Sequence, residues 1–198
     1  MNEFRKEFVK EYLTELKRMM EAAEADLIRK TDKFASILLE ARENKKTIFL
    51  MGNGGSSSTA SHVAQDLAKC TITEGLPRFK VMALTDSIPV MLAWANDASF
   101  EDIFIEQLKS LMEPGDIVVG ISGSGNSMNV IKAIEYANEN GGLTIGLSGY
   151  DGGKLLKCAQ ENIHVASFHM QRVEDIHLLV WHLLICLLRD ESAKPEVS

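Results

Sequence analysis

The sequence has little that would cross-link the chain or place it in a membrane. Its 198 residues include only three cysteines, Cys70, Cys158 and Cys186. Their spacing matches no zinc or redox motif, and an odd number is a poor disulfide framework, so we expect reduced, mostly buried thiols. The longest apolar-rich run, residues 176–188, contains two histidines. It is too short to cross a membrane and predicts a core helix.

A secretory signal and a basic surface are missing as well. The first twelve residues are charged and amphipathic, without the apolar segment of a signal peptide. The net charge is −7 and no cluster of Lys and Arg stands out, which argues against a general nucleic-acid binder. We therefore expect a cytoplasmic protein that spans no membrane and binds no nucleic acid. Its 45% hydrophobic and 25% charged residues are typical of a globular protein.

From residue 47 onward, short apolar segments alternate with helical segments. Such segments, apolar almost throughout, are typical of strands covered on both faces, so we predict an α/β fold with a doubly wound parallel sheet. The expected strands are 47–51, 79–84, 116–121, 143–148 and 162–166, and the expected helices are 57–69, 87–95, 99–112, 127–139, 152–159 and 171–189.

Residues 3–44 do not fit this alternation. Apolar residues at helical spacing predict two helices, the second beginning at about Asp26. Their apolar stripe must be buried either as a cap on the same chain or between subunits, and we favour an oligomer. We also expect the last helix to be buried against neighbouring subunits as well as its own sheet. The chain is thus divided into N-terminal helices at 1–45, an α/β domain at 46–191 and a tail at 192–198.

Two loops rich in glycine and serine carry the clearest functional signal. Residues 52–59 follow the first strand, residues 122–127 follow the third, and a helix begins after each loop. Glycines let a ligand approach the backbone, and free N–H groups at a helix start bind anions. Strand ends of a parallel sheet share one edge, so both loops can contact one phosphate. The Gly-Lys-Ser/Thr and dinucleotide motifs are absent, which favours a small phosphorylated metabolite over a nucleotide.

Two pairs of titratable residues could carry chemistry near that phosphate. His62 and Asp66 are spaced i, i+4, and Glu174 and His182 are spaced i, i+8, so each pair shares one helix face. These four groups suit Zn²⁺ or a similar divalent ion, and they would equally serve proton transfer without metal. The structural alternatives are a surface hydrogen bond for the first pair and a core histidine for His182. We assign His177, on another face, to structure.

Together these motifs resemble the sugar isomerase (SIS) domain family, and within it the phosphoheptose isomerases, over about residues 5–190. The matching stretches are Gly52–Ser56, Ala60–His62, Ala95–Asp97, Gly120–Ser127, Asp151–Gly153, and Ile176-His177 with His182. The resemblance implies a flavodoxin-like, five-stranded sheet and a homotetramer whose active sites lie between subunits. It also implies an aldose–ketose isomerase that converts sedoheptulose 7-phosphate to a heptose 7-phosphate through an enediol.

The resemblance further implies a role for each matching residue. Asp66 and His182 would be the catalytic pair, and a zinc ion would be held by His62, Asp66, Glu174 and His182. The phosphorylated sugar would be bound by Asn53, Gly54, Ser56, Asp97, Ser122, Gly123, Ser124, Ser127 and Glu174.

The chain departs from the family pattern at several positions. Asp66 stands where the family usually has Glu, and Glu174 where it has Gln. Cys70 stands where several heptose enzymes have a basic residue, and Gln171 where they have an acidic one. Other SIS proteins are non-catalytic tetrameric adaptors, including one that binds the bacterial replication initiator, and others are sugar-phosphate sensors. Adaptors tend to lack the catalytic carboxylate and histidine, so Asp66 and His182 favour the enzyme.

Overall fold

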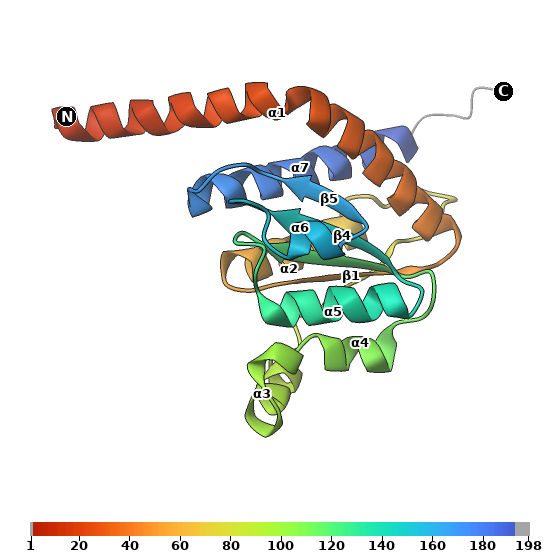
Figure 1. The fold of residues 1–198 in the computed structure, drawn as a ribbon. Helices are drawn as coiled ribbons and strands as arrows, with labels where there is room; N and C mark the ends of the chain where they lie inside the picture. Colours follow the sequence, from red (N-terminus) through yellow and green to blue (C-terminus); the bar gives the residue numbers. More distant parts are fainter. Residues whose placement is uncertain (1, 193–198) are drawn as a thin grey trace.

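The computed structural model describes residues 2–192, and it confirms the α/β fold. Five parallel strands form one sheet in the order β2-β1-β3-β4-β5, the flavodoxin-like order (Figure 1). The strands are β1 Thr47–Gly52, β2 Lys80–Ala83, β3 Ile117–Ser122, β4 Leu143–Ser148 and β5 Glu161–His164. Nearly all of the tail expected at 192–198 lies outside the described residues.

Helices cover both faces of the sheet, as its apolar strands predict. One core packs α1, α2 and α7 against side chains such as Ile48 and Leu50, while the other packs α4, α5 and α6 against Phe49 and Met51. The helices are α1 Glu3–Glu43, α2 Gly55–Lys69, α3 Ile88–Asp97, α4 Ile105–Leu111, α5 Met128–Glu139, α6 Leu155–Cys158 and α7 Met170–Ser192. The single helix expected at 99–112 is instead a 3₁₀ turn, Phe100–Asp102, followed by α4.

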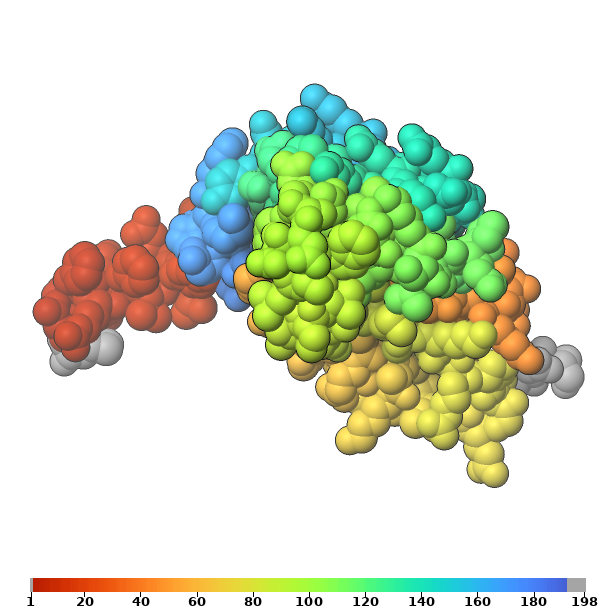
Figure 2. All heavy atoms as spheres, turned by 90° about the horizontal axis from the view of Figure 1, so that it is seen from below, coloured from red at the N-terminus to blue at the C-terminus, as the bar shows by residue number. Residues whose placement is uncertain are grey.

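The prediction of two N-terminal helices is wrong, because α1 is one helix of 41 residues. The segment 20–26 contains neither Gly nor Pro and is rich in Ala and Glu, which are strong helix formers, so nothing ends the helix there. Phe34 and Leu38 in its second half are buried in the core, whereas Phe4 and Leu13 in its first half are exposed. That first half projects from the body of the molecule (Figures 1 and 2).

The final helix, α7, has apolar side chains on faces that neither the sheet nor α1 covers. Val180 and Trp181 are buried, but Leu183 and Leu187 are exposed on the single chain. They line a groove of about 880 Å³ together with α1 side chains such as Leu13 and Ile28. Among residues 2–192, no helix combines the length and apolar character that crossing a membrane requires.

The expectation of mostly buried thiols is wrong for two of the three cysteines. All three are free, and Cys158 is half-buried, but Cys70 and Cys186 are exposed. Cys70 directly follows the last residue of α2, and Cys186 lies one turn after the exposed His182 on α7. Both side chains point away from the packed core, so an apolar side chain at these positions stays exposed.

Candidate active site

The two glycine-serine loops lie at the same edge of the sheet, as predicted. Strands β1 and β3 are hydrogen-bonded neighbours, and Gly52 pairs with Ile121 at their carboxyl ends. The first loop is tight: a Cβ on Gly52 would lie 2.7 Å from the Cβ of Ser56, so only glycine fits. Gly54 caps α2 with φ of +55°, a left-handed conformation that also favours glycine.

The expectation that the first N–H groups of α2 are free needs correction. The N–H groups of Ser56 and Ser57 donate to the carbonyls of Asn53 and Gly54, each at 3.0 Å. The turn thus uses these two backbone donors itself. The side chains of this loop, among them the Asn53 amide and the hydroxyl of the buried Ser56, are the polar groups it can present to a ligand.

The second loop is held by hydroxyl and backbone contacts. The hydroxyls of Ser122 and Ser127 lie 2.9 Å apart, and the Ser124 hydroxyl accepts from the N–H of Asn126 at 3.2 Å. A Cβ on Gly123 would collide with the sulfur of Met170. Three of the four serines expected to bind the sugar phosphate, Ser122, Ser124 and Ser127, thus lie between the end of β3 and the start of α5.

The Asp151–Gly153 stretch supports the second loop rather than forming a site of its own. The Leu155 N–H donates to the Gly125 carbonyl at 2.9 Å, and the Lys154 N–H donates to Asn126 Oδ1 at 3.3 Å. A Cβ on Gly153 would come within 2.6 Å of the Gly125 backbone. Glycine is needed here because two loops pack backbone against backbone.

The catalytic pair expected from the sequence is brought together by the packing of α2 against α7. His62 Nε2 lies 3.2 Å from Asp66 Oδ2, one turn along α2, and 3.0 Å from His182 Nε2 on α7. One ligand atom from each of these three residues lies within 4.8 Å of the others. His62 and His182 are exposed and Asp66 is half-buried, so the cluster opens onto the surface of the single chain.

Among the residues that the structure describes, Glu174 is not part of the cluster of His62, Asp66 and His182. It precedes His182 by eight positions on α7, and eight residues span roughly 12 Å of helix. Its carboxylate lies instead against the first loop, where a Cβ on Gly55 would collide with it. Of the four residues that the resemblance implies as metal ligands, three therefore lie together, and Glu174 lies beside the expected sugar-phosphate loop.

Asp97 is also set apart from the other expected site residues. It is the last residue of α3, a helix that buries none of its side chains and projects from the domain (Figure 1). Its carboxylate accepts a hydrogen bond from the adjacent Asn96 at 2.7 Å and is exposed. In the part of the chain that the structure describes, no hydrogen bond connects Asp97 to either loop.

His177 has the structural role expected from its position. It is buried, and its Nε2 donates to the Ser148 carbonyl at the end of β4 at 3.2 Å. Burial lowers the pKa of His177 from 6.5 to about 4, and the charge of His164 acts in the same direction. The side chain is therefore neutral at pH 7 and holds the end of β4 against α7.

One polar residue next to the site, Asn129, was not identified from the sequence, and neither was the contact of Cys70 with Asp66. Asn129, at the start of α5, is hydrogen-bonded to Asn53 of the first loop. The Cys70 thiol donates to Asp66 Oδ1 at 3.6 Å. Polar residues are common at the first positions of a helix, so nothing in the sequence distinguished Asn129 as a site residue. Cys70 lies i, i+4 from Asp66, so the spacing alone could have linked the two.

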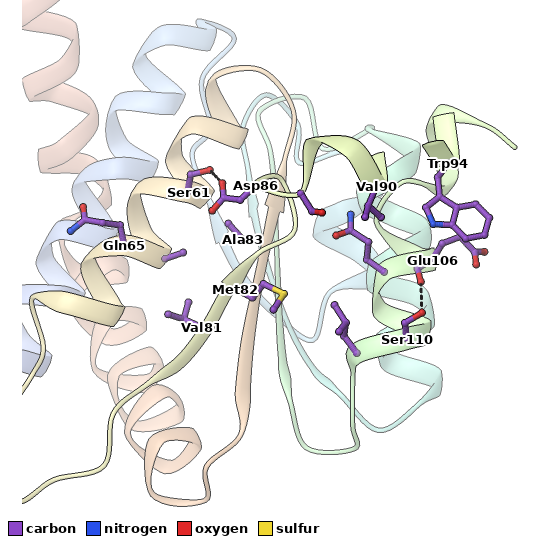
Figure 3. A pocket seen from close by; sticks show the side chains of 14 residues that line it. Ser61, Gln65, Val81, Met82, Ala83, Asp86, Val90, Trp94, Glu106 and Ser110 are labelled. Carbon is purple, nitrogen blue, oxygen red and sulfur yellow. Dashed lines mark hydrogen bonds between the residues drawn. The ribbon is translucent and has the colours of Figure 1, made fainter. Parts of the chain in front are cut away.

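A separate hollow of about 840 Å³ lies between α2, β2, α3 and α4 (Figure 3). Its walls include Met82, Val90 and Trp94, and Ser61 donates to Asp86 at its rim at 2.5 Å. None of the residues expected to bind sugar phosphate or metal lines it. The chemistry expected from the sequence therefore lies elsewhere, at the two loops and the α2–α7 cluster.

Comparison with known proteins gives consistent matches over most of the chain. The sequence pattern of the SIS domain matches residues 11–149. The phosphoheptose isomerase of Geotalea daltonii is 38% identical over 184 residues, which are 92% of this chain and 94% of that protein. The phosphoheptose isomerase of Aneurinibacillus thermoaerophilus is 34% identical over 190 residues, 94% of each chain.

The fold comparison agrees with the sequence comparison. The solved structure of phosphoheptose isomerase from Neisseria gonorrhoeae has a TM-score of 0.86 and 31% identity, and the match covers 93% of this chain and 98% of that one. The structure from Francisella tularensis has a TM-score of 0.87 at 24% identity, covering 96% and 100%, which shows a shared fold.

Proposed function

The chain belongs to the SIS domain family and is an isomerase of phosphorylated sugars, and within that class we propose that it interconverts sedoheptulose 7-phosphate and an aldoheptose 7-phosphate. The names of its relatives support the heptose substrate. The observation that carries the catalytic part is the contact of a carboxylate and two imidazoles from α2 and α7, beside loops suited to phosphate.

In this proposal, the groups that bind the phosphate and the groups that carry the chemistry belong to one site. Ser122, Ser124 and Ser127 bind the phosphate, which supplies binding energy remote from the reacting carbons. Asp66 and His182 carry the proton transfers. One removes a proton from the carbon next to the carbonyl and the other protonates the carbonyl oxygen, which gives the enediol. The isomeric carbonyl compound forms when a proton is returned to the former carbonyl carbon and another is removed from the hydroxyl of the neighbouring carbon.

A zinc ion is part of the proposal, because the donor set fits one. Two imidazole nitrogens and one carboxylate oxygen, from His62, His182 and Asp66, are a usual three-ligand set for catalytic zinc with an open position. A bound Zn²⁺ would polarise the oxygens of the substrate. Asp66 and His182 would then have two roles each, as ligands of the ion and as the groups that transfer protons.

We further propose a homotetramer in the cytoplasm, with active sites between subunits. The exposed apolar groove between α1 and α7 supports an oligomer, because such side chains are normally covered. Three free cysteines suit a reducing compartment. The exposed positions of Asp97 and of the histidine cluster leave room for a neighbouring subunit to complete the site.

A screen of pentose, hexose and heptose phosphates, with and without a chelator, tests the function. We expect turnover of a heptose phosphate, and a loss of about 10²- to 10⁴-fold in kcat for Asp66→Ala and His182→Ala. Gln65→Ala is the matched control, since Gln65 neighbours Asp66 in sequence but lines the other hollow. Full activity in both site variants would end the proposal, and no turnover of any phosphosugar would favour an adaptor.

A further inference from the structure

Asn53 and Asn129 face each other through two reciprocal hydrogen bonds. Each side-chain Nδ2 donates to the Oδ1 of the other at 2.9 Å, although 76 positions separate the residues. Asn53 follows β1 in the first loop, and Asn129 follows the second loop at the start of α5. Asn129 is only 2% exposed, while Asn53 is half-buried. The pair therefore joins the first loop to the start of α5, directly after the second loop.

The orientation of both amides follows from a backbone donor. The Val130 N–H, which also bonds the Ser127 carbonyl at 3.0 Å, lies 2.9 Å from Asn129 Oδ1. An N–H can only donate, so the atom facing it must be the amide oxygen. That places Asn129 Nδ2 against Asn53 Oδ1, and the Asn53 Nδ2 must then face Asn129 Oδ1. These three hydrogen bonds together allow only one orientation of the Asn53 side-chain amide.

We propose that Asn129 is a positioning residue that orients the Asn53 amide so that its second N–H is fixed as a donor to the phosphate group of the substrate. A primary amide has two N–H groups, and the bond to Asn129 uses one of them. Without Asn129, the Asn53 amide can rotate and present its oxygen, which a phosphate repels. This inference rests on the proposed function, because it takes the anion at the two loops to be that of a sugar phosphate.

A merely structural role makes a different prediction. If the amide pair only ties α5 to the first loop, its loss lowers the melting temperature and leaves phosphate affinity unchanged. If it orients Asn53, its loss weakens phosphate binding beyond any effect on stability. Affinity for inorganic phosphate, measured by calorimetry on the full chain, separates the two roles without requiring turnover.

Two variants change the contacts that orient Asn53: one removes both hydrogen bonds, and the other keeps the acceptor for Asn53 Nδ2 but loses the donor. Asn129→Leu removes both hydrogen bonds, and we expect phosphate to bind about tenfold more weakly, the effect of one lost hydrogen bond to a charged group. Asn129→Asp has nearly the same shape but lacks the donor to Asn53 Oδ1 and adds negative charge. We expect a larger loss of phosphate affinity for Asn129→Asp, and a higher KM for the sugar phosphate in both variants.

Asn138→Leu is the matched control on the same helix. Asn138 lies near the other end of α5, where it donates to the Cys158 carbonyl at 2.7 Å and accepts from the Thr144 hydroxyl at 2.7 Å. We expect it to lower the melting temperature without weakening phosphate binding. The inference is overturned if Asn129→Leu and Asn129→Asp bind phosphate as tightly as the unaltered protein, or if the unaltered protein binds none. If Asn129→Leu does not fold, Asn129→Ala, which removes the same two hydrogen bonds without adding charge, takes its place with the same expected and overturning results.

The two proposals can fail separately. An unaltered protein that binds phosphate but turns over no phosphosugar contradicts the proposed function, while the calorimetry of the Asn129 variants still decides this inference. Normal turnover with unchanged phosphate affinity and KM in the Asn129 variants contradicts only the inference.

Discussion

The Nε2 atoms of His62 and His182 lie 3.0 Å apart, although 120 positions separate the two residues. Their rings meet edge to face, with centroids 5.2 Å apart. His62 belongs to the helix that begins at the first glycine loop, and His182 to the helix that closes the fold. The candidate active-site cluster is therefore created by the packing of α2 against α7, and we expect changes in either helix to affect the same proposed chemistry.

The first prediction concerns metal binding by these two histidines. We expect the unaltered protein to bind one Zn²⁺ per chain, and His62→Ala or His182→Ala to lower its affinity strongly, because each removes one of three ligands that lie together. Competition with a chelating dye measures the affinity. His169→Ala is the control, because His169 lies outside the cluster and directly precedes α7. Equal zinc affinity in all four proteins would contradict the metal site.

Cys70 gives a second, chemical test of the site. Its exposed thiol lies 3.6 Å from Asp66 Oδ1, so an added carboxamidomethyl group would crowd that carboxylate. We expect iodoacetamide to abolish most isomerase activity in a Cys186→Ser background. Cys158 should react slowly, since burial raises the pKa of its thiol. Mass spectrometry locates the adduct. Adding Cys70→Ser should confer resistance, and equal inactivation with and without Cys70 would exclude this route.

Much of the fold could be predicted, because short apolar segments and Gly-rich turns are local signals. The spacing of His62 and Asp66 predicted their shared face for the same reason. The spacing of Glu174 and His182 was also read correctly as one face, yet two helical turns separate the groups, and only the register of α7 against α2 decides which of them meets His62. The role of Asn129 depends on contacts across the sheet edge, which no local pattern encodes.

His177 should make the stability of the protein depend on pH. Its folded pKa of about 4 lies below the ordinary value of 6.5, so the folded state favours the neutral ring. Its contribution is fully present above pH 6.5 and is lost as the pH falls from 6.5 toward 4, when the unfolded chain binds a proton that the folded chain does not. By pH 5 the loss should be about 2 kcal/mol.

Urea unfolding at pH 7 and pH 5 measures this loss. His177→Gln removes the titrating ring, so we expect a less stable protein at pH 7 that loses less free energy of unfolding between the two pH values. His164 on β5, whose charge also disfavours a charged His177, stays in place in both proteins. An equal loss in the variant and the unaltered protein would show that other groups cause the pH dependence.

The groove between α1 and α7 leads to a prediction about assembly. Leu183 and Leu187 on α7 are 48% and 38% exposed, and Leu13 and Ile28 on α1 are 58% and 66% exposed, so the apolar side chains of this groove remain uncovered on the single chain. If a second copy covers it, Leu183→Glu should bury a charge in that interface. We therefore expect light scattering to give the mass of a tetramer for the unaltered protein and a smaller mass for Leu183→Glu.

Leu111→Glu is the control, because Leu111 at the end of α4 is similarly exposed but lies outside the groove, and this variant should keep the mass of the unaltered protein. A monomeric unaltered protein, or a Leu183→Glu protein of unchanged mass, would contradict this role for the groove.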